Sequence, residues 1–192
     1  MNVLAFDTSG PHVAAALMVD GHILVQRQED MARGQAERLV PLLEELLSTT
    51  NMAWQDLTRI GVGIGPGNFT GIRISVSTAR GLALGLGIPA IGVSLFQTTQ
   101  YLSNWAQTGV PAPRDQLYVF DPDKMQKPIV IPADQARALA LSNEHSPQDH
   151  VAAIAHLAAT SQPPHAAPAP LYVKPADAAP PSDPPPVILD DA

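Results

Sequence analysis

The sequence predicts an α/β protein in which helices cover a mixed β-sheet. Three short apolar runs separated by turn residues occupy the first 30 positions, and a leucine repeat of helical period follows Gln35. From Ile60 to about residue 106, strand-like and helix-like segments alternate. Strands joined by short turns form an antiparallel unit, whereas strand–helix units add parallel strands. We therefore expect the order β-β-β-α-β-α-β-α and a mixed sheet.

The three N-terminal strands are predicted at residues 3–7, 13–19 and 22–28. The first strand ends at a turn over residues 8–11, which contains glycine and proline. Asp20-Gly21 separates the second run from the third. An Asp-Gly pair between two apolar runs is a strong hairpin signal, because both residues tolerate a positive φ. These strands should therefore be neighbours in one antiparallel unit.

The first helix is predicted at residues 35–48, where leucines recur at i, i+3, i+4, i+7 and i+8. A fourth strand is expected at residues 60–64 and a second helix at 71–86, with a glycine-rich turn between them. A fifth strand at 88–93 and a third helix at 95–106 complete this part of the chain.

Proline divides the chain into two parts. Only four of the 20 prolines fall in the first 110 residues, so the region that follows should hold less regular structure. There we expect strands at 117–120, 128–131 and 171–173, a helix at 133–141, and another from Ser146-Pro147 to about Thr160. The predicted division is a first lobe at 1–106, a reduced second lobe at 107–174, and a proline-rich, disordered tail at 175–192.

The composition excludes several classes of protein. The net charge is -7 and the 11 basic residues are scattered along the sequence, so we do not expect the chain to bind a nucleic-acid backbone by itself. It has no cysteine, hence no disulfide and no thiolate zinc site. The N-terminus reaches Asp7 too early for a signal peptide, and no uncharged apolar run approaches the length of a membrane span. We therefore expect a cytoplasmic protein.

The glycine-rich turn at residues 61–73 leaves a strand and enters a helix. Backbone N–H groups and the helix dipole can bind an anion at such a place. It is not a Walker A loop, since no Gly-Lys-Ser/Thr follows, and it lacks the third glycine of a dinucleotide fingerprint. The alternative is a tight turn whose glycines supply unusual dihedral angles and close packing.

Three motifs occur in chain order, supported by Arg38-Leu39-Val40-Pro41: Asp7-Thr8-Ser9, residues 65–74 and residues 87–94. Together they resemble the TsaB (YeaZ-like) family of tRNA threonylcarbamoyladenosine biosynthesis proteins. The usual central motif of the family is G-P-G-S-F-T-G-L-R, from which this chain departs mildly at Asn68 and Ile72. The resemblance covers residues 1–106, with a further match at 170–173, and thins after Gln107.

The resemblance implies an actin/sugar-kinase/Hsp70-like (ASKHA) half-fold. It also implies a non-catalytic subunit that pairs with a TsaD-like catalytic subunit, is joined by a TsaE-like ATPase, and meets tRNA only through the complex. A homodimer is compatible with the chain when it is alone. A relic nucleotide site is expected at Asp7, Thr8, Ser9, Gly65 and Gly67, without a bound cofactor. A turn-capping role is the alternative for Asp7.

The catalytic paralogue in this resemblance carries His-x-x-x-His, whose two imidazoles share one helix face and hold a metal. The corresponding positions here are Leu95 and Thr99, so we expect neither this metal site nor the transferase activity. We expect all six histidines to be surface residues: His12, His22, His145, His150, His156 and His165.

The two long helices are expected to form the partner surface, because they carry more apolar residues than one sheet-facing stripe needs. The alternative is that these residues are simply core. Two other functions stay open: a small sugar-kinase-type phosphotransferase, which needs an intact second lobe, and a glycoprotease-like hydrolase. The predicted interface residues are Leu39, Leu42, Leu43, Leu46, Ile72, Val76, Ala79, Leu82 and Ala83.

Overall fold

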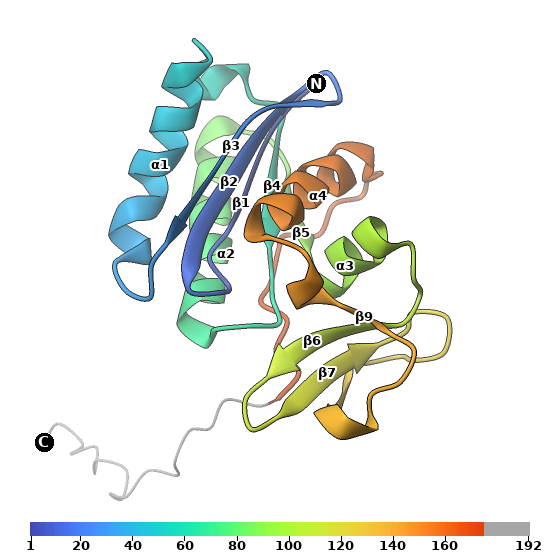
Figure 1. The fold of residues 1–192 in the computed structure, drawn as a ribbon. Coiled ribbons are helices and arrows are strands. Elements are labelled where there is room, and N and C mark those ends of the chain that lie inside the picture. Colours follow the sequence, from blue (N-terminus) through green and yellow to red (C-terminus); the bar gives the residue numbers. More distant parts are fainter. Residues whose placement is uncertain (175–192) are drawn as a thin grey trace, which may run out of the picture.

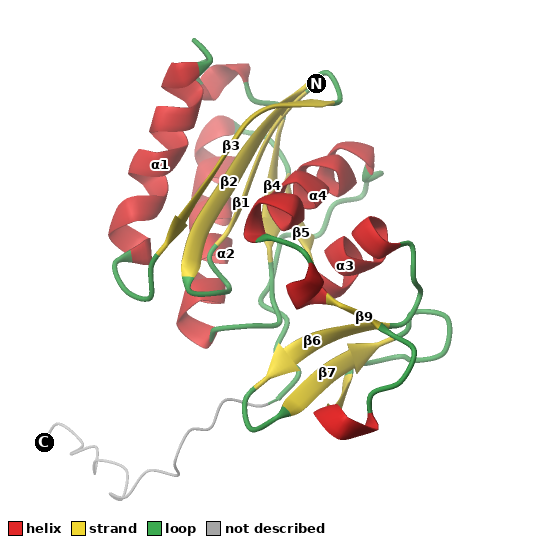
Figure 2. Cartoon of the chain, in the orientation of Figure 1, coloured by secondary structure: helices red, strands yellow, loops and turns green. Residues whose placement is uncertain are grey.

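The computed structural model describes residues 1–174, which form two sheets and their covering helices (Figures 1 and 2). The predicted disordered tail at 175–192 lies outside the described residues. None of the helices between residues 1 and 174 combines the length and the apolar character that crossing a membrane would require.

The first sheet has the order β3-β2-β1-β4-β5, and its mixed topology confirms the prediction. Strands β1, β2 and β3 are antiparallel, whereas β4 and β5 join β1 in parallel. Asp20 and Gly21 both have positive φ at the turn between β2 and β3, as the hairpin signal predicts. The strands are β1 (Asn2–Asp7), β2 (His12–Val19), β3 (His22–Asp30), β4 (Arg59–Gly63) and β5 (Ala90–Val93).

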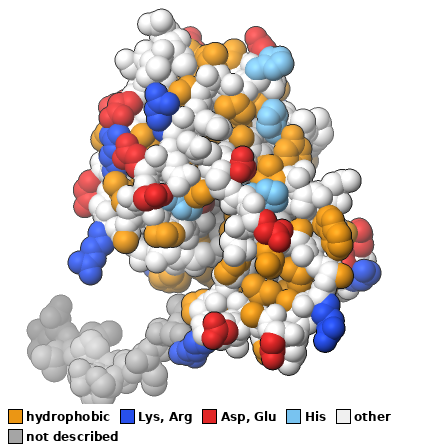
Figure 3. Space-filling model, in the orientation of Figure 1, with side chains coloured by type: hydrophobic (Ala, Val, Ile, Leu, Met, Phe, Trp, Pro, Cys, Tyr) orange, Lys and Arg blue, Asp and Glu red, His pale blue; other side chains and the backbone are white. Residues whose placement is uncertain are grey.

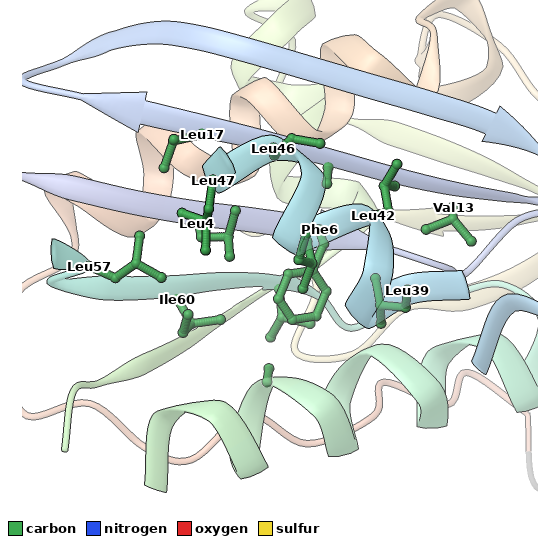
Figure 4. Close-up of a cluster of buried hydrophobic side chains, with 14 of the residues drawn as sticks. Leu4, Phe6, Val13, Leu17, Leu39, Leu42, Leu46, Leu47, Leu57 and Ile60 are labelled. Carbon is green, nitrogen blue, oxygen red and sulfur yellow. The ribbon is translucent and has the colours of Figure 1, made fainter. Parts of the chain in front are cut away.

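Helices α1 (Gln35–Thr49) and α2 (Phe69–Leu86) cover one face of this sheet (Figure 1). Figure 4 shows the leucines of α1 directed at the apolar side chains of β1, β2 and β4, with Phe6 near the middle of the cluster. Burial of such a stripe is the main stabilising contribution of an amphipathic helix. The helical period read from the sequence thus corresponds to real packing.

Helix α4 (Pro147–Thr160) lies on the opposite face of this sheet, and α3 (Leu95–Ser103) packs beside α4 and against β6. The predicted start of α4 is confirmed: Ser146 Oγ accepts from Asp149 N at 3.1 Å and Pro147 occupies the first turn. The predicted boundaries put α4 in the second lobe. However, its buried side chains, such as Ile154, pack against the first sheet. The last helix therefore belongs to the core of the first lobe.

The second sheet has the order β8-β7-β6-β9 and lies below the first in Figure 1. Its strands are β6 (Thr108–Ala112), β7 (Gln116–Phe120), β8 (Ile129–Pro132) and β9 (Ala140–Leu141). The strands predicted at 117–120 and 128–131 are confirmed as β7 and β8. Strand β6 was missed, because its sequence contains Gly109 and Pro111.

Three predictions for the later part of the chain are wrong. Residues 133–141 form no α-helix, but a short 3-10 turn (Ala133–Gln135) followed by β9. The third helix ends at Ser103, because Asn104 adopts a left-handed conformation there. Residues 171–173 form no strand. That segment is instead fixed by a hydrogen bond from Leu171 N to Ile64 O (2.8 Å).

Candidate functional site

Asp7 stands at the end of β1, at the junction of the two lobes, with only 5% of its surface exposed. Its Oδ2 accepts hydrogen bonds from Ser9 N (3.2 Å) and Ser9 Oγ (2.8 Å). His12 Nε2 lies 3.2 Å from the same oxygen. One carboxylate oxygen is therefore fully engaged with the turn that follows β1.

Gln35 and Thr8 hold this turn against the helices. Gln35 Nε2 donates to the carbonyl oxygens of Gly10 (2.8 Å) and His12 (2.6 Å). Thr8 Oγ1 donates to Gly71 O at 2.6 Å in a buried position. The Thr8 side chain is thus used to bind the turn to α2, and it does not line the cavity that Asp7 faces.

The glycine-rich turn lies next to this carboxylate. Gly65 has a φ of 90°, which favours glycine, and its carbonyl oxygen accepts from Leu95 N at 2.8 Å. Asn68 begins α2, because its side chain accepts a hydrogen bond from Gly71 N (2.8 Å). A Cβ at Gly63 would collide with Asp7 Oδ1, so the absence of a side chain there leaves room for the carboxyl group.

An interlobe cavity of about 370 Å³ opens beside Asp7. We use this name for the space lined by the glycine-rich turn, the β1–β2 turn, Leu95, β6 and the start of α4. A second cavity of about 430 Å³ shares part of this wall, from Ser9 and Gly67 to Pro111, and extends toward Tyr118. Of the predicted nucleotide-site residues, the structure brings Asp7, Ser9 and Gly67 to the interlobe cavity, but not Thr8 or Gly65.

His150 forms part of the cavity wall and is buried, so the prediction that all six histidines are surface residues is wrong. Its Nε2 lies 2.8 Å from Ser142 O and its Nδ1 lies 2.8 Å from Thr98 Oγ1. Burial lowers the pKa of His150 below its usual value. These contacts fit a neutral ring that donates from Nε2 to Ser142 and accepts from Thr98 at Nδ1.

Two buried polar atoms at the cavity have no hydrogen-bond partner among residues 1–174. They are Asp7 Oδ1 and His145 Nε2. The His145 ring stands edge-on to that of His150, with the ring centroids 6.0 Å apart. Sequence reasoning missed the contribution of His12, His145 and His150, because the three residues meet only when α4 returns to the first sheet.

The two positions at which the resemblance implies metal-binding histidines carry side chains that are not metal ligands here. Leu95 presents an aliphatic side chain to the cavity, and Thr99 Oγ1 donates to Leu95 O at 2.6 Å inside α3. Within residues 1–174, no group of three or more His, Cys, Asp or Glu side chains is arranged to hold a metal ion.

The predicted interface residues need a correction. Seven of the nine side chains are buried in the core, and only Leu82 and Ala83 are half-buried. The leucine surplus on α1 agrees with the core alternative, because these leucines pack in the same cluster as apolar side chains of the first sheet. The exposed apolar residues on these helices include Val40, at 37%, and Leu84, at 87%. The buried seven are Leu39, Leu42, Leu43, Leu46, Ile72, Val76 and Ala79.

Comparison with known proteins places this architecture in a family. The family model described as TsaD: tRNA N6-adenosine threonylcarbamoyltransferase matches residues 26–126, just over half of the 192 residues. The tRNA threonylcarbamoyladenosine biosynthesis protein TsaB of Escherichia coli strain K12 is 38% identical over 98 residues. The chain belongs to the TsaD family, in the branch that contains TsaB and YeaZ. The aligned part covers 51% of this chain and 42% of E. coli TsaB, so the chain spans less than half the length of that relative.

Solved structures confirm the fold expected of the TsaB/YeaZ branch. YeaZ from Pseudomonas aeruginosa is 26% identical, with a TM-score of 0.59 over 71% of this chain and 70% of that chain. An uncharacterized Pseudomonas aeruginosa protein with similarity to peptidase YEAZ has a TM-score of 0.69 at 21% identity. It covers 90% of this chain and 99% of that chain, and at this identity it is evidence of the fold alone.

Proposed function

We propose that this chain is a non-catalytic subunit of a tRNA threonylcarbamoyladenosine modification complex, in which it binds and supports a TsaD-like catalytic subunit. The observation that carries this proposal is family membership. It is combined with Leu95 and Thr99 at the two positions where the sequence resemblance implies the metal-binding histidines of the catalytic paralogue. A transferase that depends on that metal would be inactive with these side chains. The proposed role would place the chain in the cytoplasm with its tRNA substrate.

The partner surface in this proposal is the outer face of α2, centred on Leu84. This side chain is 87% exposed, and a Cβ at the nearby Gly81 or Gly85 would meet no atom within 4 Å. Small residues beside an exposed leucine let a partner helix approach closely. An open depression of about 480 Å³ borders this face, with Leu84 and Arg80 among its lining residues. Association would remove this apolar surface from water.

Recognition of tRNA is assigned to the complex, with a TsaE-like ATPase as a further member. The chain has a net charge of -7. On the face shown in Figure 3, the lysine and arginine side chains lie scattered at the periphery. Phosphate contacts normally require several clustered basic residues, which the catalytic partner would have to supply.

Leu84→Glu tests the proposed surface, with Ile129→Glu on β8 as the matched control. Ile129 is also an exposed aliphatic residue (46%), but it belongs to the second sheet. A glutamate at the centre of the interface must lose its hydration on association. We expect the Kd for the TsaD-like partner, measured by calorimetry, to rise at least about tenfold for Leu84→Glu and to stay unchanged for Ile129→Glu. Unchanged binding by a folded Leu84→Glu variant would place the interface elsewhere.

Reconstitution tests the non-catalytic role. Threonylcarbamoyladenosine formation should require the TsaD-like subunit, and omission of this chain should reduce it. Product formed by this chain alone would contradict the proposal. ATP-dependent phosphorylation of a sugar by the chain alone would support the phosphotransferase alternative instead.

A further inference from the structure

The C-terminal half of α2 presents an exposed apolar side chain beside an arginine. Leu84 is 87% exposed, and Arg80 precedes it by about one helical turn, so both side chains lie on the same face of the helix. Both line an open depression of about 480 Å³, which we call the Leu84 depression, together with Ile88 and part of the segment 165–168. No acidic residue between 1 and 174 lines it, and Arg80 forms no ion pair with any residue in that range. This surface therefore suits an aliphatic group that carries negative charge next to it.

Three other cavities in the described part of the chain have a different charge. No lysine or arginine of residues 1–174 lines the interlobe cavity or the adjoining second cavity. A depression on α1 has Arg27 in its wall, but Glu44 and Glu45 lie in the same wall. Of these four sites, the Leu84 depression is the one that should attract an acidic segment.

The chain leaves the described region close to the start of the same helix. Tyr172 stacks on Phe69 in the first turn of α2, with the ring centroids 4.9 Å apart, and Arg73 Nε donates to Tyr172 Oη at 3.0 Å. The Arg73 guanidinium also lies over the Phe69 ring, 3.8 Å from its centroid. These contacts, together with the hydrogen bond from Leu171 N to Ile64 O, hold residues 171–172 at the beginning of α2.

The residues that follow are numerous enough to reach the Leu84 depression. From Phe69 to Leu84, α2 advances about 22 Å along its axis, at about 1.5 Å per residue. A proline-rich sequence can span about 3.1 Å per residue, so residues 175–186 reach up to about 37 Å. The possible reach exceeds the distance along the helix, so residues after 186 can meet the far end of α2.

We propose that residues 187–191, with the sequence Val-Ile-Leu-Asp-Asp, dock in the Leu84 depression of the same chain. This segment lies outside the described residues. Its three aliphatic side chains would cover Leu84 and the apolar wall around it, while Asp190 and Asp191 would pair with Arg80. The spacing agrees, because two residues of extended chain span about 7 Å and the four residues from Arg80 to Leu84 span about 6 Å of helix.

A docked segment would lie on the surface proposed above for a TsaD-like partner, so the segment and the partner would compete for Leu84. The docking itself is a property of the free chain and does not depend on the proposed role in tRNA modification. A test without the partner therefore separates a failure of the docking from a failure of the proposed function.

A nitroxide spin label on Ala192→Cys tests the docking in the free chain of 192 residues, which has no other cysteine. The unpaired electron broadens the backbone amide signals of residues that the label approaches. We expect broadening at Gly81, Leu84 and Gly85 on α2, and none at Leu24, because its strand β3 forms the opposite edge of the first sheet from β5.

Charge exchange tests the pairing with Arg80. Arg80→Glu should lower the broadening at the three α2 amides at least about threefold, because one exposed ion pair can change an equilibrium by up to about fivefold. Arg27→Glu is the matched control on the α1 depression and should leave the broadening unchanged. Arg80→Glu combined with Asp190→Lys and Asp191→Lys should restore it, because the two sides have then exchanged their charges. Arg80 and Arg27 are both exposed, so these variants should keep the melting temperature of the wild type.

The opposite results would overturn the proposal. Docking at this site is excluded if the three α2 amides stay sharp, if Leu24 broadens as much as they do, or if Arg80→Glu leaves their broadening at the wild-type level. Isotope-enriched protein without the label, mixed with labelled protein, distinguishes docking within one chain from docking between chains. Equal broadening in that mixture would assign the docked segment to a second copy and overturn docking within the same chain.

Discussion

Truncation of Leu46 to alanine should lower the free energy of unfolding by about 3 kcal/mol. Leu46 is 1% exposed and projects from α1 into the cluster shown in Figure 4, which also contains Leu4 and Leu17. The variant loses the transfer free energy of the removed methyl groups and leaves a cavity that the β-sheet can only partly fill. For a domain of this size, about 3 kcal/mol corresponds to a fall in Tm of roughly 6–12 °C.

Urea denaturation and a thermal melt would measure this loss, with Leu84→Ala as the matched control on α2. Leu84 is 87% exposed, so its truncation should change stability by no more than about 0.5 kcal/mol. The two variants should show the opposite order in partner affinity: Leu84→Ala should weaken binding more than Leu46→Ala. A Leu46→Ala protein that melts like wild type but fails to bind the partner would refute the assignment of Leu46 to the core.

Two further predictions concern the junction of the lobes. Because the pKa of His150 is lowered in the folded state, protonation favours the unfolded chain. The contribution of His150 to the free energy of unfolding should therefore be fully present above about pH 6.5 and should decline as the pH falls below that value. The charges around this ring are Asp7, His145 and Asp149, and denaturant titrations at pH 7.5 and 5.5 would detect the effect. If the free energy of unfolding of His150→Gln fell between pH 7.5 and 5.5 as much as that of the wild type, His150 would not be the cause of this pH dependence. Gly63→Ala should destabilise the protein, because its Cβ would collide with Asp7, whereas Gly81→Ala on the open face of α2 should stabilise it by up to about 1 kcal/mol. Equal melting temperatures for the two variants would exclude a close contact at Gly63.

The first lobe was predictable because its signals are local. The apolar runs, the Asp20-Gly21 turn and the leucine period depend on residues that are neighbours in sequence. The Ser146-Pro147 start of α4 was predictable for the same reason. The second lobe was harder to predict from the sequence, because its short strands contain residues that are unfavourable in strands, such as Gly109 and Pro111. Residues 133–141 have a helix-like composition, but β9 pairs with β6 instead.

Some residues of the candidate site could be predicted from the sequence and others could not. Asp7, Ser9 and Gly67 could be predicted, because they follow strand ends and belong to motifs of a recognisable family. His145 and His150 could not be predicted as site residues, because nothing in their sequence spacing shows that α4 packs against β1 and brings them to the cavity. Sequence reasoning also left open whether the leucines of α1 form a core or an interface.

The sequence by itself determined the order of the strands and helices in the first lobe, the turn chemistry around Asp7, and the absence of the histidine pair. The tertiary structure alone decided which apolar side chains are buried and which polar atoms share a cavity. The reason is that periodicity defines the faces of a helix, but not what covers them. Only the packing of α1 on the sheet buries Leu46, and only the return of α4 brings His145 to the cavity that Asp7 lines.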